Sequence, residues 1–188
     1  MRLSRRSVMS TPFRPAVDLL AKYAEYHRDR RNIATHFIGV PMIVFGIGVL
    51  LAWPSVRAGG LVLTPAWLAF ALAAAWYMTR GQATLGAFTA AAVGMLILLA
   101  HAVPGGLAAW LGWGGGFFVA GWIIQFIGHY YEGRKPAFVD DLVGLLVAPM
   151  FVVLEALAPL GLFKGLMTEI ELRAGPTLIR DLAHPATR

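Results

Sequence analysis

Two short stretches of the sequence carry side chains that could bind a metal. The first, YHRDRRNIATHFIGVP, contains His27 and His36 and passes from a basic segment into an apolar one. The second, QFIGHYYEGRKPA, places His129 and Glu132 at the close of a very apolar segment. Imidazole and carboxylate groups bind both zinc and non-haem iron, and the chain has no cysteine that would add a thiolate. Because residues three apart share a helix face, Glu132 could bind a metal together with His129 or hold its imidazole by a hydrogen bond.

The composition is typical of a membrane protein. Of the 188 residues, 58% are hydrophobic and 14% are charged, whereas a soluble domain has about 25% charged residues. The formal net charge is +6, and half of the lysines and arginines precede the first apolar segment. Because the aromatic residues lie mostly inside apolar segments, we attribute this charge to contact with anionic lipid and exclude nucleic acid as a partner. The absence of cysteine excludes disulfides.

Five apolar segments approach the length of about 20 residues with which a helix crosses a bilayer. They are residues 33–52, 61–78, 83–100, 107–128 and 142–162. We therefore predict an all-α, polytopic helical membrane domain over residues 15–162, between a basic N-terminus at 1–14 and a polar tail at 163–188. Apolar residues at helical spacing from Ala16 to His27 predict an amphipathic surface helix before the first span.

Positive charge predicts how the segments are oriented. The basic N-terminus and the loops at Arg80 and at Arg134 and Lys135 are expected in the cytoplasm, because such loops stay on that side of the membrane. We therefore expect an integral protein of a bacterial inner membrane. The fifth segment contains Pro149 and precedes a basic tail, so we expect four spans plus a broken or re-entrant helix. Five full spans, with the tail outside, are the alternative.

This topology gathers three histidines on the cytoplasmic side. They lie at the end of the surface helix, in the first turn of the first span and at the end of the fourth: His27, His36 and His129. A continuous helix would turn His27 and His36 to opposite faces, so we expect a break with Asn32 as the N-cap. His101 falls at the opposite end and His184 in the polar tail. We interpret both as bystanders.

Other interpretations are open on the residues alone. An interfacial histidine often bonds to a headgroup or a backbone carbonyl, and Glu132 could form a surface ion pair with Arg134. The chain could then be a noncatalytic lipid-binding scaffold or a small transporter. A transporter would place ionisable groups near mid-membrane, often in repeated halves. Here the polar groups crowd one interface and no repeat is visible, which favours an enzyme. A zinc-dependent lipid hydrolase would use the same ligand types as an iron enzyme.

The two stretches, extended by AFVDDLVGLLVAPMFVVLE, resemble the Mpo1-like family over about residues 20–160. The matching polar positions and prolines include His27, Asn32, His36, Gln125, His129, Glu132, Arg134, Pro136 and Glu155. The resemblance implies that Fe(II) and O2 shorten a 2-hydroxy fatty acid by one carbon, in fatty acid α-oxidation.

The resemblance also implies roles for individual residues. The catalytic metal site is expected to comprise His27, His36, His129 and Glu132. The substrate's carboxylate and 2-hydroxyl would lie at the membrane interface, with its tail among the helices. Arg134 or Lys135 would then neutralise the carboxylate, and Gln125 would contact the substrate.

Overall fold

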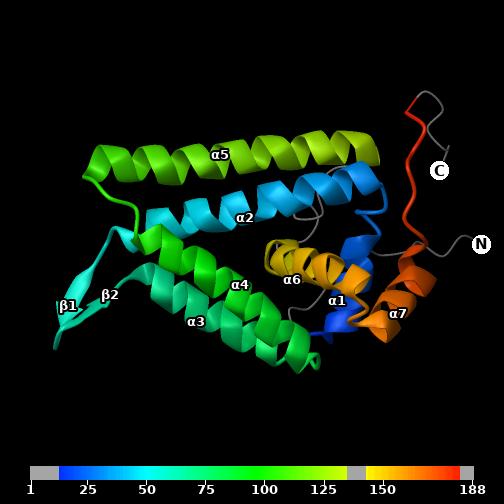
Figure 1. The fold of residues 1–188 in the computed structure, drawn as a ribbon, viewed down its shortest axis with the longest axis horizontal. Coiled ribbons are helices and arrows are strands. Elements are labelled where there is room, and N and C mark those ends of the chain that lie inside the picture. Colours follow the sequence, from blue (N-terminus) through cyan, green and yellow to red (C-terminus); the bar gives the residue numbers. More distant parts are fainter. Residues whose placement is uncertain (1–12, 135–142, 183–188) are drawn as a thin grey trace, which may run out of the picture.

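A computed structural model describes residues 13–134 and 143–182, so Lys135 lies outside the described residues. The predicted all-α class is confirmed (Figure 1). The helices are α1 (Ala16–Ala24), α2 (Arg30–Ala52), α3 (Pro65–Met78), α4 (Ala83–His101), α5 (Leu107–Glu132), α6 (Val143–Leu157), the 3-10 helix η2 (Ala158–Leu160) and α7 (Lys164–Ala174). The strands β1 (Val56–Ala58) and β2 (Leu61–Leu63) form a short antiparallel hairpin between α2 and α3.

Among the described residues, four helical segments are long and apolar enough to cross a membrane. They are α2, α4, α5 and the segment Val143–Leu160. The predicted second span is shorter than expected, because residues 61–63 belong to β2 and Thr64 caps α3 through its hydroxyl. The 14 residues of α3 extend about 21 Å, at about 1.5 Å per residue.

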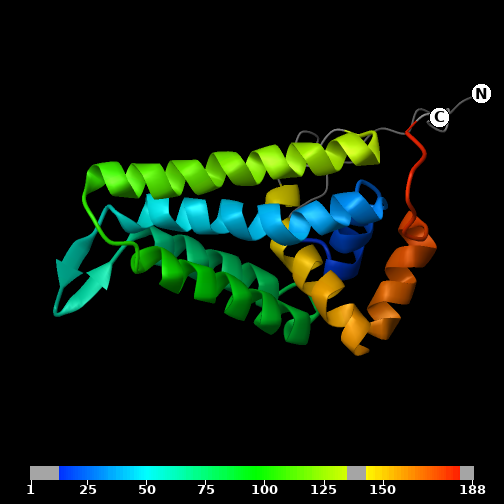
Figure 2. The ribbon, with the colours of Figure 1, turned by 45° about the horizontal axis from the view of Figure 1, so that its top comes forward.

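Helices α2 and α5 lie antiparallel and side by side along their lengths (Figures 1 and 2). Glycines allow this close approach. A Cβ atom at Gly46 would lie 2.8 Å from the carbonyl oxygen of Gly114, and one at Gly121 would lie 2.9 Å from that of Gly39. Such contacts between small residues bring two membrane helices together, backbone against backbone. They fix how far α5 is shifted along α2, and therefore which residues of the two helices face each other.

The predicted break at Pro149 in the fifth apolar segment is wrong. The segment Val143–Leu160 is long and apolar enough to cross a membrane, and its re-entrant path stays a prediction. Helix α6 continues through Pro149, which is buried among neighbouring helices. The backbone N–H of Arg28 lies 3.0 Å from Glu132 at the end of α5, and its guanidinium lies 3.9 Å from Glu155 near the end of α6. Helices α5 and α6 therefore end at the same end of the bundle. Helix α6 begins about halfway along α2 (Figure 1).

The predicted helix before the first span is present as α1, but protein covers its apolar face. Leu20 is fully buried in one core with Phe151 and Leu154 of α6 and Ile170 of α7. Outside this core, Arg173 of α7 forms an ion pair with a carboxylate of α1. Helices α1, α6 and α7 thus form a small packed unit at one end of the long helices (Figure 2).

Candidate metal centre

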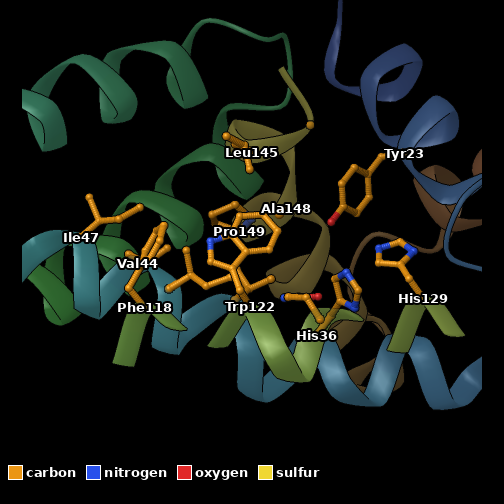
Figure 3. Close-up of a pocket in the computed structure, with 14 residues that line it drawn as sticks. Tyr23, His36, Val44, Ile47, Phe118, Trp122, His129, Leu145, Ala148 and Pro149 are labelled. Atoms are coloured by element: carbon orange, nitrogen blue, oxygen red, sulfur yellow. The ribbon is translucent and has the colours of Figure 1, made fainter. Parts of the chain in front are cut away.

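Three buried histidines meet where the packed unit joins α2 and α5. His27 comes from the connector between α1 and α2, His36 from α2 and His129 from α5. Each offers one ring nitrogen, and these three atoms lie within 4.8 Å of one another. Figure 3 shows His36 and His129 at the same end of a cavity. The predicted gathering of the three histidines is therefore present, whereas their role as ligands stays a prediction.

The helix break between His27 and His36 is confirmed, but its predicted cap is wrong. Helix α2 begins at Arg30, and its N-cap is Asp29, whose carboxylate accepts a hydrogen bond from the Arg31 backbone N–H at 2.8 Å. Asn32 lies inside the helix. Asp and Asn are about equally favourable at the N-cap position, so residue type alone did not show which of the two residues caps α2. His27 is in the connector immediately before this cap.

Asn32 instead joins the connector to α5. Its side-chain amide donates to the Tyr26 carbonyl at 3.1 Å and to the Glu132 carboxylate at 3.1 Å. Its backbone carbonyl lies 2.8 Å from Nδ1 of His36. Asn32 therefore holds one of the clustered imidazoles and one end of the connector at the same time.

The ring nitrogens of the cluster show why these residues suit a cation. Nδ1 of His27 lies 2.7 Å from the Tyr23 carbonyl, and Nδ1 of His36 bonds to a carbonyl as well. A carbonyl only accepts, so in the neutral rings both Nδ1 atoms carry the proton and both Nε2 atoms are lone-pair acceptors. These two Nε2 atoms lie 2.9 Å apart. Two lone pairs do not form a hydrogen bond, and a shared cation would satisfy both.

The remaining histidine adds a second unsatisfied position. Nδ1 of His129 is buried and has no hydrogen-bond partner among the described residues. Burial, followed by the neighbouring His36 and His129, holds the pKa of His27 well below its usual range. His27 is therefore neutral, which is the form that binds a metal. The three residues fit a divalent metal by donor type, since neutral imidazoles are common ligands of zinc and iron, and their ligand atoms lie within 4.8 Å of one another.

Glu132 has a different place from the predicted one. Its Oε2 accepts hydrogen bonds from the backbone N–H groups of Arg28 and Asp29, at 3.0 and 2.8 Å, in addition to the amide of Asn32. Its Oε1 lies 2.7 Å from a guanidinium nitrogen of Arg180. Among the described residues it does not belong to the group of close ligand atoms. The structure therefore shows Glu132 holding the connector that carries His27.

Residues 175–182, which we name the C-terminal strap, also bind the connector that carries His27. No pattern in the sequence predicted this contact. Leu178 donates its N–H to the Arg28 carbonyl at 2.8 Å and accepts from the Arg30 N–H at 2.9 Å. The backbone N–H of Arg180 donates to the Asp29 carboxylate at 2.7 Å. Asp29 could have been suspected from its place two residues after His27 among basic residues. Arg180 gave no local signal, because its partner Glu132 is 48 residues away.

The charge of Asp29 follows from the same contacts. Burial by itself would raise its pKa, but hydrogen bonds from the Arg31 side chain and from the N–H groups of Arg180 and Arg31 lower it to about 2. Asp29 is therefore ionised at neutral pH, and it links α2 to the C-terminal strap.

The predicted substrate contacts lie in two different surroundings. Arg134 donates to the Glu25 carbonyl at 2.8 Å, and its guanidinium lies 5.3 Å from the centre of the Tyr26 ring, so it binds the end of α1 and the connector. Gln125 is 4% exposed and lines the cavity beside His36 and His129. Its amide oxygen is buried without a hydrogen-bond partner. The structure thus brings Gln125, and not Arg134, to the histidine cluster.

An apolar cavity of about 180 Å³ extends from the cluster between α2, α5 and α6 (Figure 3). Its lining is Tyr23, His36, Val40, Ile43, Val44, Ile47, Phe118, Trp122, Gln125, His129, Gly144, Leu145, Ala148 and Pro149. Tyr23 was not predicted to be part of the site, although it lies four residues before His27. Its ring stacks on that of His27, with centroids 4.0 Å apart. The cluster therefore has a polar head region that opens into an apolar space.

Comparison with known proteins gives two matches. The model of a family described as "2-hydroxy-palmitic acid dioxygenase Mpo1-like" matches residues 13–160. The 2-hydroxy-palmitic acid dioxygenase MPO1 of Saccharomyces cerevisiae is 31% identical over 154 residues, which are 81% of this chain and 85% of the yeast protein. No solved structure matches the chain.

Proposed function

The chain belongs to the Mpo1-like family, and from this premise we propose that it is an iron-dependent dioxygenase that shortens 2-hydroxy fatty acids by one carbon. One observation carries the proposal: three buried imidazoles with unsatisfied nitrogens lie at the head of an apolar cavity. The yeast relative's name gives the substrate class. The candidate span helices give the membrane environment from which a fatty acid would come.

We assign His27, His36 and His129 to the metal. When bound, Fe(II) would supply the activation of O2 and a charge that attracts the carboxylate and 2-hydroxyl oxygens of the substrate. Three protein ligands leave positions open for substrate, as catalytic metal sites require. Carbonyl groups fix the rings of His27 and His36 so that both present Nε2 to the shared space.

The other residues of the head region act on the substrate. The unpartnered amide of Gln125 is the group we assign to a substrate oxygen in place of Arg134, whose guanidinium is engaged at the connector. The apolar walls would exclude water and orient the tail away from the cluster. Glu132, Asp29 and the C-terminal strap hold the connector, so their effect on the reaction passes through His27.

Metal analysis and product analysis test the proposal together. Protein purified without oxygen should contain close to one equivalent of iron and, on addition of O2, convert 2-hydroxypalmitate to a fifteen-carbon acid. One equivalent of zinc with ester hydrolysis would indicate a hydrolase instead. If iron-loaded protein leaves 2-hydroxy acids of several chain lengths unchanged, the dioxygenase proposal fails and the scaffold interpretation replaces it.

We also propose that the histidine end of the bundle faces the cytoplasm of a bacterial cell. The chain contains no cysteine, so single cysteines can report orientation. Arg30→Cys lies at the histidine end and Arg57→Cys in the hairpin at the other end, and both positions are exposed. In intact cells an impermeant reagent should label only the Arg57→Cys protein. Labelling of only the Arg30→Cys protein would reverse the orientation.

A further inference from the structure

The lining of the cavity extends over about the length of one acyl chain in a membrane leaflet. On α2 its lining residues His36, Val40, Ile43, Val44 and Ile47 follow helical spacing along one face. On α5 the lining residues are Phe118, Trp122, Gln125 and His129, again on one face. Eleven positions separate the histidine from the far residue on each helix. At about 1.5 Å per residue both walls extend about 16 Å. This length is close to half of a hydrocarbon core about 30 Å thick, and half of the core is the depth that one acyl chain fills.

The two ends of this cavity differ in polarity. At the head lie the two imidazoles and the Gln125 amide, which is 4% exposed and has an unpartnered oxygen. Tyr23 also lines the cavity, with its ring stacked on His27. Every other lining side chain beyond Gln125 is apolar apart from the indole N–H of Trp122. A ligand that satisfies both ends needs polar atoms at one terminus and an unbranched apolar body. A long-chain acid has this form, whereas a sterol or a two-chain lipid does not.

The cavity is also open to the membrane at its side. Ile47 and Leu145 line it, yet they are 40% and 45% exposed. Among the described residues, α6 packs mainly on α4, α1 and α2, and not along α5. Within the described part of the chain, the cavity therefore reaches the surface beside Ile47 of α2 and Leu145 of α6, two helices apolar enough to lie in a membrane. A chain could enter sideways from the bilayer without passing through water.

We propose that this cavity binds a single acyl chain, head at His36 and His129, and that Ile47 and Phe118 at the far end limit the length of the chain. The inference rests on the proposed function for its head group, but it adds the path of the tail and the residues that measure it. Larger side chains at the far end select shorter acids, and smaller ones admit longer acids.

The first test is the chain-length profile of the iron-loaded protein. Ile47→Trp should lower kcat/KM for the longest accepted 2-hydroxy acid by at least about tenfold, because excluding even one methylene has an effect of that order. Shorter acids should be unaffected, and Phe118→Ala should extend the profile to longer acids. Ile38→Trp is the matched control, since Ile38 is 58% exposed on the same helix and does not line the cavity. An unchanged profile in both Ile47→Trp and Phe118→Ala overturns the proposal.

The second test does not depend on activity. A fatty acid brominated at mid-chain should quench the fluorescence of Trp122, which lines the cavity, and the unbrominated acid should relieve this quenching by competition. Trp122→Phe should remove the part of the quenching that the unbrominated acid relieves. Trp113→Phe should retain it, because Trp113 is 51% exposed and lies outside the lining. Competed quenching without turnover would support the cavity and count against the dioxygenase. Turnover with no competed quenching at Trp122 would support the dioxygenase and overturn the cavity assignment.

Discussion

The two ends of the helical bundle both contain histidine, buried at one end and half-buried at the other, but they hold it differently. At the hairpin end, Nδ1 of His101 lies 2.7 Å from the Ile97 carbonyl, Nε2 lies 2.9 Å from the Thr64 hydroxyl, and the ring stacks on Trp67. Both nitrogens are therefore satisfied within the fold. At the other end, two Nε2 lone pairs face each other and Nδ1 of His129 has no partner. Hydrogen bonding thus separates a histidine whose two ring nitrogens are satisfied within the fold from histidines that keep unsatisfied nitrogens.

Removing one of the clustered imidazoles should have the largest effect on metal binding. We expect His36→Ala to lose bound iron almost completely, because the protein supplies three close ligand atoms and this change removes one. His101→Ala should retain iron at the wild-type level. Metal analysis of protein refilled with Fe(II) is the measurement. Equal loss of iron in the two variants would mean that hydrogen bonding does not distinguish the ends.

Glu132→Gln should weaken the metal centre without abolishing it. The amide has one acceptor oxygen, so it cannot serve the Arg28 and Asp29 N–H groups and also pair with Arg180. Loss of such an outer hydrogen-bond partner typically lowers metal affinity about 10- to 100-fold. Titration of iron against a competing chelator measures the change. Glu169→Gln, on the exposed side of α7, is the control.

Complete loss of iron in Glu132→Gln, equal to that in His36→Ala, would instead make Glu132 a ligand. That outcome would restore the role expected from the sequence. Wild-type affinity would show that the connector does not need the carboxylate.

The C-terminal strap should have a smaller influence, through the same connector. Arg180→Ala leaves the buried Glu132 with three donors, so we expect metal affinity to fall by less than in Glu132→Gln. Arg180→Lys should recover part of it by keeping the charge. Arg173→Ala removes exposed ion pairs in the last turn of α7 and should leave affinity unchanged. If Arg173→Ala and Arg180→Ala lower metal affinity equally, the strap acts through general stability only.

The strap lies beyond residues 13–160, which the family model matches.

The smallest effect is expected at the hairpin end. Thr64→Ala removes the N-cap of α3 and the partner of His101. We expect a loss of about 1 kcal/mol in the free energy of unfolding, as for other caps, with iron content unchanged. Chemical denaturation in detergent measures the first quantity and metal analysis the second. Loss of iron here would show that the two ends are coupled.

Local patterns in the sequence predicted much of the fold. Apolar segments of sufficient length predicted the long helices. Errors arose where neighbours override local preference. Pro149 lies within an unbroken helix because α6 is packed among other helices. The prediction of Asn32 as the N-cap of α2 is wrong, because its contacts with Tyr26 and Glu132 are not visible in local sequence.

By itself, the sequence determined the helical class with long apolar segments and which three histidines gather at one end of the bundle, because hydrophobic length and charge act on each segment separately. Only the tertiary structure decided that Glu132 and Arg180 hold the connector, that Arg134 turns away from the cavity, and that Gln125 turns into it. These placements depend on the position of α5 along α2 and on contacts between residues up to 151 positions apart. A hydrogen bond depends on the distance and angle between two groups, and those are fixed only when the helices have packed.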